Sequence, residues 1–209
     1  MTAGIIRLKR PVLIGLTGGP GVGKSEAAKM LSEKGAKIIS ADAIGHDILR
    51  HNKSVRNKVI KLLGRDVLDN KSEFDRRKIG AIVFSDTEMM LAFNRLIHPV
   101  LLKQLKAELL RYSGNKRHKM IVIDAALIFE WRIADWFDII LTINALRNIR
   151  LNRICSFGLS IDKAKKRIAS QIPQRQKISL SDYVIENNAS RQKLKTKINS
   201  FITAIEKLL

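Results

Sequence analysis

A glycine-rich segment constrains the fold of this 209-residue chain more than any other feature. Residues 12–25 read VLIGLTGGPGVGKS: an apolar run, then a cluster of glycines, then lysine and serine. Glycine loses more backbone entropy on folding than any other residue, so the cluster needs a reason beyond packing. The apolar run predicts a buried strand at Val12–Thr17, and the residues after the cluster predict a helix over Glu26–Lys34 that stops at Gly35.

Gly18–Ser25 match the pattern GxxxxGK[ST] between that strand and that helix. In this pattern backbone N–H groups wrap a phosphate chain, and the positive end of the helix faces the same anion. Lys24 is expected to reach the β- and γ-phosphates, and Ser25 to offer its hydroxyl to Mg²⁺. The predicted ATP-binding residues here are Gly19, Pro20, Gly21, Val22, Gly23, Lys24, Ser25 and Glu26. The alternative is a tight strand-to-helix turn that ends in Lys-Ser.

The rest of the chain alternates between strand and helix patterns. Further strands are expected at Lys37–Ser40, Met120–Asp124, Phe137–Thr142 and Tyr183–Glu186. Between the second and third strands the pattern is helical, with breaks near Lys53, Gly64, Asp75, Ser85 and Pro99, and Ser85–Glu88 fits a capping box. A helix is expected over Ile161–Gln171, and the terminal helix carries an apolar stripe of Leu194, Ile198, Ile202, Ile205 and Leu209.

These patterns predict an α/β fold in three layers, the P-loop NTPase fold, with a five-stranded parallel sheet. We expect one domain over residues 1–209, with its core at about 11–42 and 119–209. A helical substrate-binding insert is expected at about 43–118, and a helical lid at about 146–178.

Charge and composition bear on partners and location. The chain has 39 Lys and Arg against 19 Asp and Glu, a net charge of +20, which attracts anions such as nucleic acids, acidic membranes or phosphorylated small molecules. The basic residues are spread along the chain and aromatics make up only 5%, which argues against nucleic acid as the main partner. No apolar run could span a bilayer, Met1–Arg10 has no signal-peptide core, and the single Cys155 suits a reducing compartment. A cytoplasmic monomer or small homo-oligomer is expected.

Among nucleotide-binding classes, the sequence favours a small kinase. Asp42–Gly45 fits the DxxG element of GTPases, but it follows Lys24 too closely to leave room for a switch region, and no NKxD element is present. A kinase needs a carboxylate near the γ-phosphate to take the proton of the acceptor hydroxyl. Asp42 ends the second strand and is the predicted base, with a helix cap as the alternative. Asp124 ends the third strand and either holds Mg²⁺ through water or is a buried acid bound to backbone amides.

Several segments in order resemble dephospho-CoA kinases. They are LTGGPGVGKS, IISADAIGHDIL, FDRRKIGAIVF, LIHP, IDAALIFE, ASQIPQRQK and SDYVIENN, and they run from about Val12 to Asn188. The resemblance implies that ATP donates its γ-phosphoryl group to the 3′-hydroxyl of dephospho-CoA, giving coenzyme A and ADP. ATP and dephospho-CoA are then the expected partners.

The resemblance also implies site residues, each with a plainer alternative. Asp42 matches the family's base, and Arg76 matches a substrate-side arginine, or else a solvated helix residue. His98 and Leu127 match substrate-side positions, with a capping or packing histidine and a core leucine as the alternatives. Arg153 matches a lid arginine that neutralises charge on the transferred group, and the alternative is an exposed basic residue. Asn187 lies where loops contact adenine, although a plain turn also fits.

Other positions depart from the family pattern. Position 40 has Ser40 where the family has an acid, and position 126 has Ala126 where it has a proline. Phe157 lies where a second lid arginine is common. Pro20 gives the cradle no N–H donor, and Glu26 puts an anion near the phosphates. Arg150 and Arg167 are candidates to replace the missing lid arginine. Two further hypotheses stay open: a kinase of another small hydroxylated or nucleotide-like acceptor, and a nucleotide-dependent nucleic-acid-binding protein.

Overall fold

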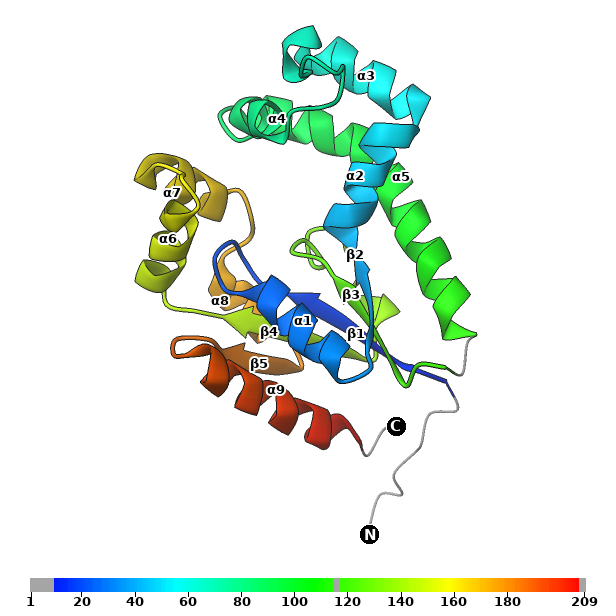
Figure 1. Ribbon diagram of the computed structural model, residues 1–209, viewed down its shortest axis with the longest axis vertical. Helices are drawn as coiled ribbons and strands as arrows, with labels where there is room; N and C mark the ends of the chain where they lie inside the picture. Colours follow the sequence, from blue (N-terminus) through cyan, green and yellow to red (C-terminus); the bar gives the residue numbers. More distant parts are fainter. Residues whose placement is uncertain (1–9, 115–116, 207–209) are drawn as a thin grey trace. The chain divides into compact units, whose positions relative to one another are not determined.

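The computed structural model describes residues 10–114 and 117–206. In chain order the elements are β1 (Val12–Thr17), α1 (Lys24–Glu33), β2 (Lys37–Ser40), α2 (Ala41–His51), α3 (Lys53–Leu63), α4 (Arg76–Val83), α5 (Thr87–Ser113), β3 (Met120–Asp124), β4 (Ile139–Asn144), α6 (Arg147–Ser156), α7 (Ile161–Ala169), α8 (Gln174–Ser179), β5 (Tyr183–Glu186) and α9 (Arg191–Ile205) (Figure 1). Short 3₁₀ turns at Arg65–Val67 and Ala134–Trp136 complete the described secondary structure.

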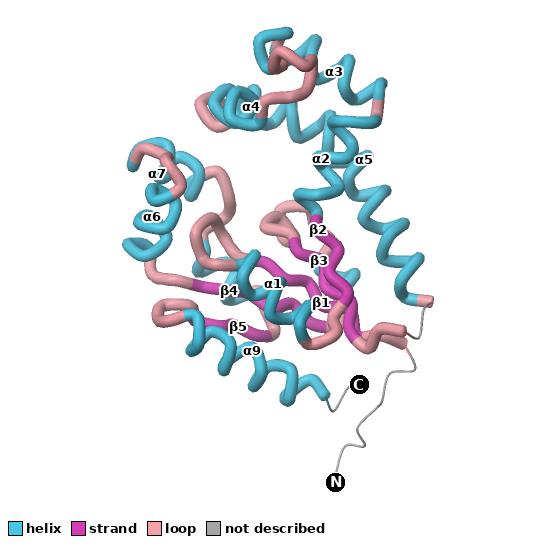
Figure 2. The backbone as a smooth tube through the Cα atoms, in the orientation of Figure 1, coloured by secondary structure: helices cyan, strands magenta, loops and turns pink. Residues whose placement is uncertain are grey.

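The described strands form one parallel sheet in the order β2-β3-β1-β4-β5. This sheet confirms the predicted α/β class. The glycine-rich loop leaves the carboxyl end of the central strand β1, where ligands gather in sheets of this type. Figure 2 shows the strands side by side, with loops that lead from β1, β4 and β5 into helices.

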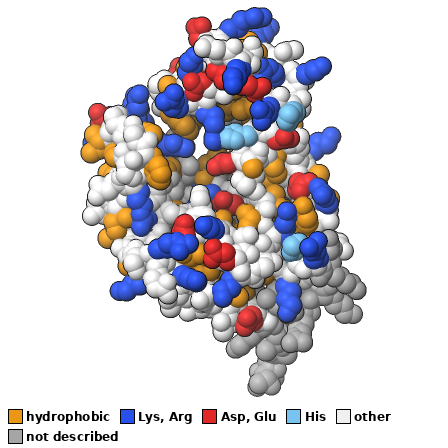
Figure 3. Space-filling view, viewed as in Figure 1, with side chains coloured by type: hydrophobic (Ala, Val, Ile, Leu, Met, Phe, Trp, Pro, Cys, Tyr) orange, Lys and Arg blue, Asp and Glu red, His pale blue; other side chains and the backbone are white. Residues whose placement is uncertain are grey.

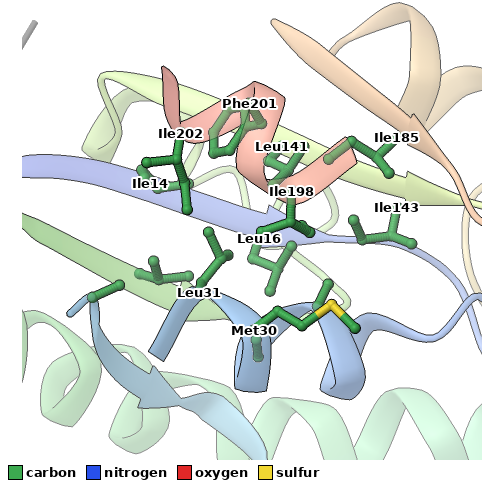
Figure 4. Packing of buried hydrophobic residues seen from close by; sticks show 14 of the residues in the cluster. Ile14, Leu16, Met30, Leu31, Leu141, Ile143, Ile185, Ile198, Phe201 and Ile202 are labelled. Atoms are coloured by element: carbon green, nitrogen blue, oxygen red, sulfur yellow. The ribbon is translucent and has the colours of Figure 1, made fainter. Parts of the chain in front are cut away.

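The main core lies between one face of the sheet and helices α1 and α9. Ile14 and Leu16 of β1 and Leu31 of α1 are fully buried there, and Ile198 and Phe201 of α9 close the layer (Figure 4). Helix α8 and the segment between β3 and β4 cover the opposite face of the sheet, since a Cβ on Gly15 would lie 2.8 Å from the Phe137 ring. Burial on both faces explains why the inner strands β1, β3 and β4 are mainly apolar runs rather than alternating ones.

The chain forms two compact units. The first unit contains the residues up to Ser40 and those from Glu108 onward, and so holds the whole sheet. The second unit, Ala41–Ala107, is helical and includes α2, α3, α4 and most of α5. Among the described residues no helix is both long and apolar enough to cross a membrane.

Several sequence predictions of element boundaries are wrong. The expected break at Pro99 does not occur, because α5 runs through it and the buried Ile97 and Leu101 anchor the helix on either side. The cap of α5 is Asp86 rather than Ser85: its carboxylate accepts the Glu88 and Met89 amides at 2.8 and 3.3 Å.

Two further differences lie in the first unit. Strand β4 begins at Ile139, two residues later than predicted, because the Asp138 carboxylate binds the Leu13 amide at 2.8 Å and sets the start of the strand. Helix α7 ends at Ala169 instead of Gln171, and α8 was not predicted. Leu209, placed in the terminal apolar stripe, lies outside the described residues.

Candidate active site

The P-loop, residues 18–25, connects β1 to α1 and depends on glycine in two ways. Gly21 and Gly23 have φ values of 78° and 90°, which side chains disfavour. Neighbouring atoms also leave no room for a side chain at either glycine. A Cβ on Gly21 would lie 2.6 Å from the Arg150 carbonyl oxygen, and one on Gly23 would lie 2.3 Å from Asn187 Nδ2. Because α1 begins at Lys24, its amino end and positive dipole face whatever the loop encloses.

The backbone amides at the start of the P-loop are not all available to a phosphate. Pro20 has no N–H, and the Gly19 N–H donates to Gln174 Oε1 at 3.0 Å. The Gln174 amide group in turn donates to the Ile143 carbonyl at 3.0 Å, which ties α8 to both the loop and β4. The amides that a phosphate chain would meet therefore begin at Gly21.

Lys24 forms an ion pair with Asp124, at the carboxyl end of β3. The Lys24 Nζ donates to Asp124 Oδ1, and both side chains are mostly buried, at 13% and 12% exposure. Asp124 is thus paired with a lysine, where the sequence analysis considered backbone amides or water-mediated Mg²⁺. The pair puts a carboxylate and the P-loop lysine at one point on the edge of the sheet.

Ser25 and Glu26, the next residues of α1, face different surroundings. Ser25 is exposed in the first turn of α1, beside Lys24. Glu26 Oε1 accepts a hydrogen bond from Arg191 Nε of α9 at 2.5 Å, so its carboxylate is directed towards α9. This pairing answers the concern that an anion at position 26 would repel a bound triphosphate.

Arg153 and Asn187 meet at the outer side of the P-loop backbone. Arg153 of α6 donates to the Gly21 and Val22 carbonyls at 3.3 Å each and to the Asn187 carbonyl at 3.0 Å. The buried Asn187 side chain donates to the Val22 carbonyl at 2.8 Å. Both residues hold the loop in shape through its carbonyl groups, a structural role that the sequence analysis did not foresee for either.

A buried ion pair fixes the segment that follows β3. Lys177 of α8 is fully buried and donates to Glu130 at 2.8 and 3.1 Å and to the Ala126 carbonyl at 2.5 Å. The Ala126 carbonyl also accepts from the Thr17 hydroxyl at 3.1 Å, and Glu130 also accepts from the Ile172 amide at 3.1 Å. Burial is the main cause of the lowered pKa of Lys177. Leu127, the substrate-side candidate of the first unit, lies in this fixed segment, where it is partly buried.

The second unit carries the remaining predicted site residues. Asp42 is exposed in the first turn of α2, which begins at Ala41, so Asp42 is not the N-cap of that helix. Arg76 is exposed and begins α4, directly after the N-cap Asp75. His98 lies in the middle of α5, not between two helices as predicted, and burial lowers its pKa.

His46 is a neighbour of these residues that the sequence analysis missed. Burial lowers the pKa of His46, the charge of Arg76 lowers it further, and the charge of Asp42 acts in the opposite direction. Asp42 and Arg76 therefore both lie within electrostatic range of His46 inside the second unit. The helical spacing of Asp42 and His46, four residues apart on α2, was the available signal.

Comparison with known proteins identifies the family. The family model for dephospho-CoA kinase matches residues 12–193. A dephospho-CoA kinase of Fusobacterium nucleatum is 36% identical over 93% of this chain and 98% of its own length, and one of Carboxydothermus hydrogenoformans is 35% identical over 89% and 90%.

Solved structures agree with these relatives. A dephospho-CoA kinase from Campylobacter jejuni has a TM-score of 0.66 at 26% identity, covering 93% of this chain and 97% of its own. A protein from Thermus thermophilus reaches a TM-score of 0.74 at 26% identity, covering 94% and 99%. A shikimate kinase from Bacteroides thetaiotaomicron, at 14% identity and a TM-score of 0.55, shares the fold. The chain belongs to the dephospho-CoA kinase family.

Proposed function

We propose that the chain transfers the γ-phosphoryl group of ATP to the ribose 3′-hydroxyl of dephospho-CoA, giving coenzyme A and ADP. Membership of the family supports this reaction. The observation that carries it in the structure is the P-loop itself, whose glycines at 21 and 23 leave no room for side chains and whose lysine stands at the start of α1. Such a loop is suited to a phosphate chain.

In this proposal Lys24 binds the phosphates of ATP, and Asp42 is the general base. The acceptor 3′-oxygen attacks the γ-phosphorus, the bond to the oxygen that bridges the β- and γ-phosphorus atoms breaks, and ADP leaves with that electron pair. Asp42, exposed at the start of α2, takes the proton of the hydroxyl. Lys24 exchanges its contact with Asp124 for phosphate oxygens, and Arg153 adds positive charge beside the loop.

Mg²⁺ fits the oxygen donors at the edge of the sheet. Mg²⁺ is usually held by one or two protein oxygens together with phosphates and water. The exposed Ser25 hydroxyl and the Asp124 carboxylate are oxygen donors of that kind. The described residues contain no cluster of three or more His, Cys, Asp or Glu side chains that would form a complete metal cage, which agrees with an ion shared with the nucleotide. When bound, the ion would neutralise charge on the phosphates.

In this proposal dephospho-CoA, the acceptor, is bound mainly by residues of the second unit. We expect the insert, about 43–118, to bind dephospho-CoA through Arg76 and His98, with Leu127 contributing from the segment after β3. The exposed guanidinium of Arg76 suits a phosphate of the acceptor. Residues 146–178, which include α6, α7 and most of α8, are the proposed lid. Asn187, Gly19, Pro20 and Val22 complete the proposed ATP site.

The surface charge is consistent with a small-molecule kinase. Figure 3 shows Lys and Arg side chains scattered over the visible face with Asp and Glu between them, not gathered into one basic stripe. Both proposed substrates are polyanions, so a basic surface favours their encounter with the protein. The single Cys155 supports a reducing, cytosolic location.

The test is a coupled ADP-release assay across acceptors. Dephospho-CoA is expected to support turnover well above AMP, adenosine or pantothenate, and equal or greater turnover with another acceptor would reassign the substrate. The variant Asp42→Asn is expected to lower kcat by about 10²-fold or more while ATP affinity stays nearly unchanged. Asp47→Asn, also exposed on α2, is the matched control and should keep wild-type kcat. Wild-type turnover by Asp42→Asn would remove Asp42 from the mechanism.

A further inference from the structure

Arg150 is a buried cation beside the P-loop. Only 6% of it is exposed, and Arg150 and Lys177 are the basic residues that are buried among residues 10–114 and 117–206. Arg150 Nε donates to the Pro20 carbonyl at 3.0 Å. Its guanidinium covers Gly19, since a Cβ on Gly19 would lie 2.5 Å from Arg150 Nη2. The side chain thus runs along the first half of the P-loop.

The charge of Arg150 is not balanced by the protein. Lys177 has Glu130 as its partner, whereas Arg150 forms no ion pair with a carboxylate in the described part of the chain. An arginine stays protonated in proteins, so a full positive charge is buried here. Burying a charge without a partner is costly, and a counter-ion that binds beside it recovers part of that cost.

Other basic residues lie near Arg150. The pKa of Lys177 is lowered chiefly by burial, and the charges of Arg150 and Lys24 contribute in the same direction. Burial followed by the charge of Arg147 also lowers the pKa of Arg150 itself. Asp124 and Glu130 balance the charges of Lys24 and Lys177, so the charge of Arg150 is the unbalanced one beside a loop shaped to enclose a phosphate chain.

We propose that Arg150 is a phosphate-binding residue of the ATP site, whose guanidinium Nη groups pair with oxygens of the triphosphate enclosed by the P-loop. Among the described residues these groups have no acceptor, while Nε anchors the side chain to Pro20. The planar fork of arginine matches phosphate oxygens bidentately. The inference rests on the proposed function, because it requires a triphosphate in the P-loop.

Arg153 of α6 also contacts the P-loop, but its Nη groups already have acceptors. Arg153 places its Nη groups on three carbonyls and so is already committed to the backbone. Phe157, the residue at the position of a second lid arginine, has no charge and is 86% exposed at the end of α6. Unlike Arg153, Arg150 therefore has Nη groups that are available to phosphate oxygens.

The test measures binding of inorganic tripolyphosphate, which has neither base nor ribose, to the full-length protein by calorimetry. Arg150→Met keeps the aliphatic part of the side chain but removes the guanidinium and its charge, and we expect the Kd to rise about tenfold to hundredfold. Lys195→Met removes an exposed cation from α9, and its Kd should stay within about twofold of wild type. Adenosine affinity should change far less than tripolyphosphate affinity in Arg150→Met.

A purely structural role for Arg150 predicts different results. If Arg150 only holds Pro20 in place, the ratio of the tripolyphosphate Kd of Arg150→Met to that of wild type should not depend on salt. If its charge contacts the phosphates, that ratio should fall as KCl rises from about 0.05 M to about 0.5 M. Should Arg150→Met not fold, Arg150→Lys decides by the same titrations, with an expected loss of about threefold to tenfold because a point charge replaces the fork. An unchanged Kd or a salt-independent ratio overturns the inference. If the wild-type protein neither binds tripolyphosphate nor phosphorylates dephospho-CoA, the proposed function itself fails.

Discussion

Replacing Lys177 by methionine removes the positive half of a buried ion pair while keeping most of the side-chain volume. Lys177 has three ammonium hydrogens, and all three have acceptors: two on the Glu130 carboxylate and one on the Ala126 carbonyl. In Lys177→Met the carbonyl keeps the Thr17 hydroxyl at 3.1 Å, so it is not left without a donor. Glu130 keeps only the Ile172 amide at 3.1 Å and becomes a carboxylate without a cation.

The expected cost follows from the burial of Glu130. Removing one partner of a buried ion pair costs about 3–5 kcal/mol, because the other charge remains uncompensated. The Glu130 side chain is 19% exposed, so water reaches part of it, and the lower end of that range applies. We therefore expect Lys177→Met to lower the free energy of unfolding by about 3 kcal/mol. That is a large share of the roughly 5–15 kcal/mol by which domains are stable.

Urea denaturation followed by circular dichroism measures this loss, together with the double variant Lys177→Met/Glu130→Gln. The double variant holds neither charge, so it should be more stable than Lys177→Met alone by at least about 1 kcal/mol. The reasoning is refuted if Lys177→Met lowers the free energy of unfolding by less than about 1 kcal/mol. It is also refuted if the double variant has the same free energy of unfolding as Lys177→Met.

Two further predictions concern the P-loop and the second unit. Gly21→Ala should weaken ATP binding about tenfold, because alanine disfavours a φ of 78° and its Cβ would lie 2.6 Å from the Arg150 carbonyl oxygen; nucleotide titration measures this, and an unchanged Kd would contradict it. His98 has a lowered pKa in the folded state, so the unfolded chain binds its proton first, and stability should fall as the pH drops below about 6.5. His98→Gln should flatten that pH dependence in urea melts, and an equally steep profile would exclude His98 as its source.

The sheet could be predicted from the sequence because its signal is local. Four of the five strands have the predicted bounds, since each is a short, mainly apolar run that ends at a polar residue. The errors arose where tertiary contacts or helix length decide the structure. Asp138 sets the start of β4 through a contact with Leu13 that is remote in sequence, and α5 tolerates Pro99 because packing on both sides outweighs one lost hydrogen bond.

The candidate site was predictable in its motifs but not in its contacts. The pattern around Lys24 is local and identified the P-loop directly. The partners of that loop come from distant parts of the chain, such as Gln174 on α8 and Asn187 after β5, so no local pattern could pair them with it. Arg153 was expected to face the transferred phosphate, and its contacts with loop carbonyls follow from how α6 packs, which sequence periodicity does not specify.

Pro20 in the P-loop and Glu26 directly after it depart from the family pattern, and each is compensated by one long-range contact. Pro20 gives up an amide donor, but its carbonyl accepts Arg150 Nε, and this contact brings a buried guanidinium to the loop that lacks the amide. Glu26 adds a negative charge next to Ser25, and Arg191 of α9 holds that charge in an ion pair. In the proposed ATP site, Arg150 would therefore supply positive charge where Pro20 offers no amide, and Arg191 would hold the charge of Glu26 in an ion pair.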